Sequence, residues 1–171
     1  MRGVRAASGI RLAVLALFLG STLGVQCGGG EAQTWVALIP RASTVGTFAP
    51  LEVDVVVSTP TPVQAFELGL QWDPQMLQAV NAAPHPGFDD DGALFVSPRF
   101  DLVAGTLERV ADLRHGGPGA EGRFTIATLE FLSLGVAGST TIELATGRLA
   151  DADGGEPATL NLVPVTITIE P

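Results

Sequence analysis

Few residues in this chain combine the side-chain types and spacing that catalysis requires. Histidine occurs twice, as His85 and His115, in loops rich in proline or glycine, without a spaced partner of the kind found in metal sites. No serine lies in a nucleophile-elbow pattern. Glycoside cleavage by paired carboxylates needs a substrate cleft, for which a domain of this size leaves little room. The sequence therefore predicts that the protein is not an enzyme.

Two acidic clusters have the composition of loops that offer oxygen ligands. One holds Asp89 and Asp91 in DDDG, and the other holds Asp151 and Asp153 in DADGG. An EF-hand register that starts at Asp151 would need an acid at Leu162, so that calcium motif fails. We interpret both clusters as turns, because aspartate bonds its own downstream backbone and glycine accepts positive φ. Calcium is the alternative at either cluster, and we expect no other cofactor.

Residues 1–26 have the composition of an export signal. A stretch with three arginines leads into the apolar run IRLAVLALFLG, which has the length of a signal core and is too short to span a bilayer permanently. We therefore expect the protein to leave the cytoplasm, and residues 34–171 to form one folded domain.

Two interpretations of signal cleavage stay open. In the first, as in bacterial lipoproteins, Cys27 carries a lipid and the glycine-rich residues 27–33 tether the domain to the cell surface or outer envelope. In the second, an ordinary signal peptidase cuts before Gln33 and the protein is secreted. Cys27 is the only cysteine, so the chain forms no internal disulfide.

The charge of the chain narrows its choice of partners. All nine basic residues are arginines, three of them lie in the signal, and the other six face 18 acidic residues. Such an acidic surface disfavours nucleic acid and anionic lipid. We expect contact with a membrane only through a lipid on Cys27. Cations, basic protein faces and neutral sugars remain compatible with this charge.

Beyond the signal, the chain is a series of short strand-like runs cut by glycine, proline and aspartate. In AFELGLQW, every second residue is apolar and is expected to face inward: Phe66, Leu68, Leu70 and Trp72. We interpret Asp73 and Pro74 as a corner, because proline cannot extend a strand ladder and restricts the residue before it. The pattern predicts an all-β domain, a two-sheet antiparallel β-sandwich of about nine strands.

Two of the expected strands change phase along their length. The run GRFTIATLEFLSLG requires a bulge near Ala127 and Thr128, because its apolar residues change parity there. The final run, ATLNLVPVTITIE, contains Pro164, which requires a bulge or an edge position.

The order of these segments resembles that of cohesin domains. The corner WDPQML is similar to the YDPxxL corner of that family, and GTLERVAD, GRFTIATLEFLSL, STTIEL and GRLADADG follow in the family's order, over residues 35–169. The resemblance implies a nine-stranded sandwich with jelly-roll topology, related to certain carbohydrate-binding modules. It also implies a non-catalytic domain that binds dockerin modules. We expect a single domain of this type and not a multi-module scaffold.

The resemblance further implies a partner-binding face, built partly from the strand before the corner. Glu67 falls on a position usually held by an acid, and Ala65 replaces an amide-type residue. Ala111 and Asp112 resemble an Ala–acid pair of the family, whereas Arg109 replaces an apolar residue. The predicted face consists of Ala65, Glu67, Arg109, Ala111, Asp112 and Gly154. The alternative interpretation, in which the polar members are only solvated strand positions, stays open.

Three functions remain for such a domain. The first is an exported module that binds a protein, for example a dockerin-bearing secreted enzyme of extracellular polysaccharide degradation. The second is direct carbohydrate binding, which usually needs exposed flat aromatic rings, whereas most tryptophans and phenylalanines here fall on inward positions. The third is a structural or assembly role in the envelope, as a lipoprotein without a dockerin partner.

Overall fold

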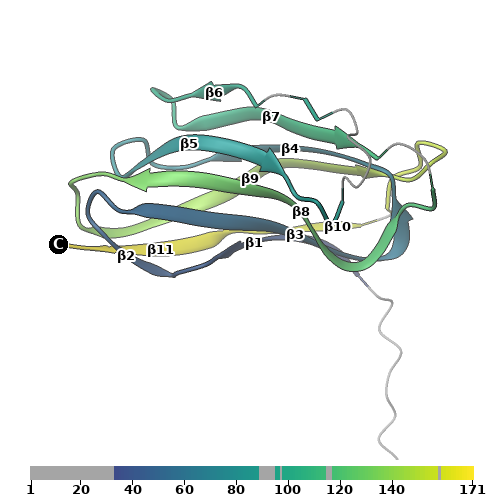
Figure 1. Ribbon diagram of the computed structural model, residues 1–171, viewed down its shortest axis with the longest axis horizontal. Helices are drawn as coiled ribbons and strands as arrows, with labels where there is room; N and C mark the ends of the chain where they lie inside the picture. Colours follow the sequence, from purple (N-terminus) through teal and green to yellow (C-terminus); the bar gives the residue numbers. More distant parts are fainter. Residues whose placement is uncertain (1–32, 89–94, 97, 115–116, 158) are drawn as a thin grey trace, which may run out of the picture.

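The computed structural model describes residues 33–88, 95–96, 98–114, 117–157 and 159–171. These residues form strands in two sheets that run along the long axis of the molecule (Figure 1). The strands are β1 (Thr34–Pro40), β2 (Thr44–Gly46), β3 (Pro50–Val63), β4 (Ala65–Gln71), β5 (Leu77–Pro84), β6 (Phe100–Asp101), β7 (Thr106–Leu113), β8 (Ala120–Ser133), β9 (Gly138–Ala150), β10 (Leu160–Val163) and β11 (Val165–Glu170). The predicted all-β class is confirmed. Over the described ranges, no helix has the length and hydropathy needed to cross a membrane.

The order of strands is β10-β1-β3-β8-β5 in the first sheet and β2-β11-β9-β4-β7-β6 in the second. The prediction of nine antiparallel strands is wrong in two respects. The described part of the chain contains eleven strands, several of them short. In addition, β1 pairs with β10 in parallel, and β11 pairs with β2 in parallel. The jelly-roll connectivity stays a prediction.

The parallel pairs arise at two of the places where the chain passes from the first sheet to the second. One passage lies between β1 and β2, and the other lies at Pro164, between β10 and β11. The two passages run side by side in the same direction, which places Thr34 opposite Leu160 and Thr44 opposite Thr168. The sequence predicts a bulge or an edge position at Pro164, and the structure instead ends β10 at Val163 and begins β11 at Val165 in the other sheet. Proline suits this break because it cannot donate a ladder hydrogen bond.

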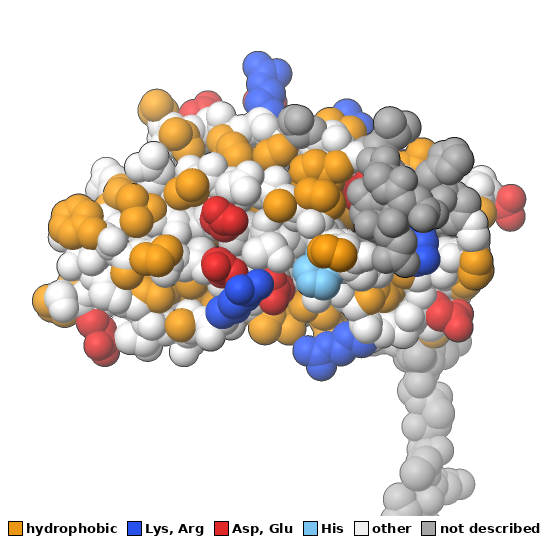
Figure 2. Space-filling view, in the orientation of Figure 1, with side chains coloured by type: hydrophobic (Ala, Val, Ile, Leu, Met, Phe, Trp, Pro, Cys, Tyr) orange, Lys and Arg blue, Asp and Glu red, His pale blue; other side chains and the backbone are white. Residues whose placement is uncertain are grey.

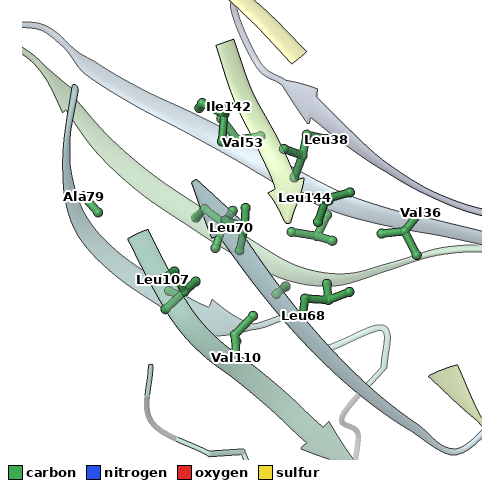
Figure 3. Packing of buried hydrophobic residues seen from close by; sticks show 14 of the residues in the cluster. Val36, Leu38, Val53, Leu68, Leu70, Ala79, Leu107, Val110, Ile142 and Leu144 are labelled. Atoms are coloured by element: carbon green, nitrogen blue, oxygen red, sulfur yellow. The ribbon is translucent and has the colours of Figure 1, made fainter. Parts of the chain in front are cut away.

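The space between the sheets is filled by the inward residues of both (Figure 3). Val53 of β3 and Leu68 of β4 are fully buried, and Leu68 thus has its predicted inward orientation. Burial of each such side chain stabilises the fold by about 1.5–3 kcal/mol. Between β3 and β8, Val55 pairs with Ala127 and the next residue, Val56, pairs with Thr125. Ile126 of β8 is therefore the extra residue of the predicted bulge.

The Trp-Asp-Pro segment after β4 is a corner, as predicted. The indole Nε1 of Trp72 donates a hydrogen bond to the Leu77 carbonyl oxygen at 3.0 Å, and the ring packs edge-on against Phe131. The Asp73 carboxylate accepts the backbone N–H of Gln75 at 2.8 Å. Asp73 therefore has a structural role in turning the chain from β4 into β5.

Charge is distributed over the surface in small groups. Figure 2 shows acidic and basic side chains close together on one face, among hydrophobic and neutral polar atoms. In one such group, Arg41 forms an ion pair with Glu52, and its Nη2 atom also lies 3.8 Å from the Oδ1 atom of Asp54. These pairs lie at and near the outer side of β3, away from the second sheet.

Candidate functional site

A hollow of about 410 Å³ lies on the outer face of β9, β4 and β7. All six residues of the predicted partner-binding face line it: Ala65, Glu67, Arg109, Ala111, Asp112 and Gly154. The other lining residues are Phe66, Val96, Leu113, Arg148, Leu149, Ala150 and Glu156. Residues far apart in the sequence are thus brought together at one place on the surface.

The register of the three strands defines the floor of the hollow. Glu67 of β4 lies between Ala111 of β7 and Arg148 of β9. In the next row, Ala65 lies between two apolar neighbours, Leu113 and Ala150. Successive outward residues on a strand share a face, so these two rows form one surface.

Apolar side chains also rise at one side of this floor. Val96 pairs with Ala111 in an isolated bridge and is 42% exposed, and Leu113 is 45% exposed. Three of the residues in the two rows are alanines, whose short side chains leave space above the sheet. An apolar centre beside charged groups is the usual anatomy of a protein–protein interface.

Two ion pairs occupy the charged side of the hollow. The Nη2 atom of Arg109 lies 3.4 Å from the Oε2 atom of Glu67. Arg148 donates from Nε and Nη2 to the Oε1 atom of Glu156, at 2.9 and 2.6 Å. The hydrogen bond and charge of Glu156, and to a smaller extent the charge of Glu67, raise the pKa of Arg148. Arg148 is therefore fully protonated at any physiological pH.

Bulges on both neighbouring strands meet at Gly69 of β4. The β7 strand has an extra residue between Leu107 and Val110, and β9 has one between Leu144 and Thr146. A Cβ at Gly69 would lie 2.6 Å from the Thr146 hydroxyl and 3.3 Å from the Glu108 carbonyl oxygen, so a larger residue there would require these neighbours to shift. Bulges re-aim side chains, and Arg109, which lies within the β7 bulge, contacts Glu67.

The structure buries Asp112, which the resemblance to cohesin domains assigns to the partner-binding face. It is 3% exposed and lies opposite the inward Phe66, so its side chain belongs to the inner side of β7. The reason is strand alternation: if Ala111 faces outward, the next residue faces inward. One carboxylate oxygen accepts the backbone N–H of Leu113 at 2.8 Å. Asp112 thus borders the hollow from within the fold.

The second acidic cluster forms the turn that the sequence predicts. One carboxylate oxygen of Asp151 accepts the backbone N–H groups of Asp153 and Gly155, at 2.9 and 2.7 Å. Gly154 has a φ of 80°, which favours glycine. This turn carries Gly154 to the edge of the hollow.

The other predicted chemical groups are placed as follows. The Nδ1 atom of His85 accepts the backbone N–H of Gly87 at 3.1 Å, within a turn that leads to the fully buried Phe88. Within the described residues, no group of three or more His, Cys, Asp or Glu side chains is placed to hold a metal ion. Cys27, Asp89, Asp91 and His115 lie outside the described residues.

Sequence reasoning missed four side chains that shape the hollow. Leu113 has the parity of Ala111 and could have been found by alternation alone. Arg148 precedes the buried Leu149, which is a weaker signal of the same kind. Val96 and Glu156 come from irregular segments, and no sequence pattern predicts their position beside β7 and β9.

Comparison with known proteins identifies the fold. No protein-family model and no curated protein matches the chain. A type II cohesin dyad from an adaptor scaffoldin of Acetivibrio cellulolyticus has a TM-score of 0.66 and 16% identity, over 79% of this chain and 48% of that one. This chain thus spans about half the length of that two-module structure.

Two further structures match over nearly their full lengths. A non-cellulosomal cohesin from the archaeon Archaeoglobus fulgidus has a TM-score of 0.66 and 15% identity, over 82% of this chain and 93% of that one. A type II cohesin in a cohesin–X-dockerin complex from Acetivibrio cellulolyticus has a TM-score of 0.64 and 16% identity, over 81% and 100%. The chain therefore has the cohesin fold, as the resemblance implied.

Proposed function

We propose that this domain is a non-catalytic module that binds another protein through the hollow on β9, β4 and β7. The observation that carries the proposal is the composition of that hollow. An apolar floor of small residues is bordered by the exposed Val96 and Leu113 and by two ion pairs. The cohesin fold supports it, since one structure with this fold is a complex with an X-dockerin module.

The proposed partner is a dockerin-bearing secreted enzyme that takes part in extracellular polysaccharide degradation. In this proposal residues 1–26 direct export, residues 27–33 form a tether and residues 34–171 form the binding domain. A lipid on Cys27 would hold the module at the cell surface, whereas cleavage before Gln33 would release it. The acidic chain, with a net charge of −9, is compatible with a partner that presents a basic face.

The aromatic residues favour a protein ligand over a sugar. A sugar platform needs several flat rings open to solvent. Trp72 is only 6% exposed, and Phe66 and Phe88 are buried against each other. Phe48 is 71% exposed, but its ring lies over Gly135, away from the hollow, and one ring does not form a platform. Trp35 lies on the first sheet with the Arg123 guanidinium 5.7 Å from its ring centre, so its ring already has a partner.

Capture from the culture medium of the source organism tests the proposal. The mature protein is immobilised as the wild type, as Ala65→Arg in the floor of the hollow, and as Asn81→Arg on β5 of the other sheet. We expect the wild type and Asn81→Arg to retain the same protein, and Ala65→Arg to lose it. A dockerin partner folds around calcium, so chelation should release it. Equal retention by wild type and Ala65→Arg would contradict the proposal.

A further inference from the structure

The two ion pairs in the hollow differ in their contact geometry. Arg148 holds Glu156 through two N–H groups at 2.6 and 2.9 Å. Arg109 approaches Glu67 through one nitrogen at 3.4 Å, and the two side chains are 54% and 45% exposed. Both pairs are exposed, since Arg148 and Glu156 are 70% and 48% exposed, and water screens such pairs. By its single long contact, Arg109 is nevertheless held more loosely on Glu67 than Arg148 is on Glu156.

Glu67 is the acid best placed to meet a partner. It lies in the same cross-strand row as Ala111, so its carboxylate stands beside the apolar floor. Glu156 comes from the segment after the turn at the edge of the hollow and is engaged by Arg148. The local charge that a partner meets is therefore decided by Glu67 and Arg109.

The charge of the whole chain indicates the sign of the partner's group. With nine arginines against 18 acids, the chain has a net charge of −9. Its field attracts cationic groups and opposes anionic ones, and juxtaposed like charges are costly at an interface. An acidic partner would gain only the loosely held Arg109, whereas a basic partner gains Glu67 and the surrounding field.

We propose that a lysine or arginine of the partner replaces Arg109 on Glu67, and that Arg109 is a selectivity residue which the partner's cation must displace. This inference rests on the proposed function, because it names the chemistry recognised by the same hollow. The displaced Arg109 side chain turns to solvent, where its charge is hydrated. An aliphatic side chain next to the partner's cation would contact Leu113 and Val96.

Truncation of Arg109 is expected to change the binding affinity in the opposite direction to truncation of an ordinary contact residue. If Arg109 bound the partner directly, its removal would weaken binding. If Arg109 competes with the partner's cation, removal of its side chain strengthens binding, because Glu67 no longer has to be released. Arg109→Lys keeps the competing charge and should bind nearly as the wild type does.

A library of random peptides displayed on phage provides the probe. Peptides are selected on the full mature protein, and those whose binding is lost with Ala65→Arg are kept as directed to the hollow. Each is then titrated against wild type, Arg109→Ala, Arg109→Lys, Glu67→Gln and the control Arg41→Ala. Arg41 is an exposed arginine paired with Glu52 outside the hollow. Thermal unfolding checks that every variant is folded.

We expect hollow-directed peptides to be enriched in lysine or arginine beside an aliphatic residue. Arg109→Ala should bind them about three- to tenfold more tightly, Glu67→Gln about tenfold more weakly, and Arg41→Ala as the wild type does. Enrichment in acidic residues, or weaker or unchanged binding by Arg109→Ala, would overturn the inference and leave the proposed function standing. If no selected peptide were sensitive to Ala65→Arg, the proposed function itself would fail.

Discussion

Arg109 and Glu67 face each other across β7 and β4, with 3.4 Å between Nη2 and Oε2, at a place where β7 carries a bulge. The pair lies at the border between apolar and charged parts of the hollow. Because both side chains are about half exposed, we interpret the pair as a feature of recognition and not of stability.

A double-mutant cycle should show that the Arg109–Glu67 pair contributes little to the stability of the fold. We expect Glu67→Gln, Arg109→Gln and the double variant to give a coupling free energy of less than about 1 kcal/mol, because water screens exposed pairs. Urea unfolding at moderate salt provides the measurement. A coupling above about 2 kcal/mol would instead make the pair a structural element of the second sheet.

Leu68→Ala should destabilise the domain strongly. Leu68 is fully buried between the sheets, and removal of such a side chain leaves a cavity, with an expected loss of about 2–5 kcal/mol. Leu113→Ala is the control on the same sheet, since Leu113 is 45% exposed and its truncation should change the free energy of unfolding by less than about 1 kcal/mol. If both variants lost similar amounts of unfolding free energy, Leu68 would not be a core residue.

Gly105→Ala should be more costly than Gly154→Ala. Both glycines have positive φ, 67° and 80°, which costs an alanine about 1–2 kcal/mol. A Cβ at Gly154 meets open space, whereas one at Gly105 would overlap the Trp72 carbonyl oxygen and the Pro74 ring. Chemical denaturation should rank the two variants in that order. Equal losses would show that the corner can move away from Gly105 without cost.

Asp151→Ala should weaken the turn beside the hollow, and Asp151→Asn should largely preserve it. The asparagine keeps an oxygen that accepts the two backbone N–H groups, whereas alanine leaves them to water, at an expected cost of about 1 kcal/mol. Thermal unfolding with calcium and with a chelator separates the two interpretations of this cluster. A higher midpoint in calcium that disappears in both variants would favour the calcium alternative.

Much of the fold could be predicted from local patterns in the sequence. Alternation identified the inward face of β4, and the missing N–H of proline marked the breaks at Pro74 and Pro164. The parity change in β8 predicted a bulge, found at Ile126. The parallel pairing of β1 with β10 could not be predicted, because it depends on where two segments distant in sequence cross between the sheets.

The candidate site was predictable only in part. The resemblance to cohesin domains placed six residues around one hollow, although its role in binding stays a proposal. The inward orientation of Asp112 follows from the outward position of Ala111 and could have been predicted. Arg109 has the parity of Ala111, which pairs with Glu67, so its place on the same face was predictable. The place of Val96 depends on an irregular segment and has no signature in local sequence.

The most direct test of the binding face is site-specific photo-crosslinking in the culture medium of the source organism. A photoreactive amino acid is placed at Ala65 in the hollow, and in a matched variant at the exposed Asn81 on β5 of the other sheet. Mass spectrometry then identifies the attached protein. We predict one specific adduct from position 65 and none from position 81. An adduct from position 81 alone, or the same adducts from both, would contradict the assignment of the hollow as the binding face.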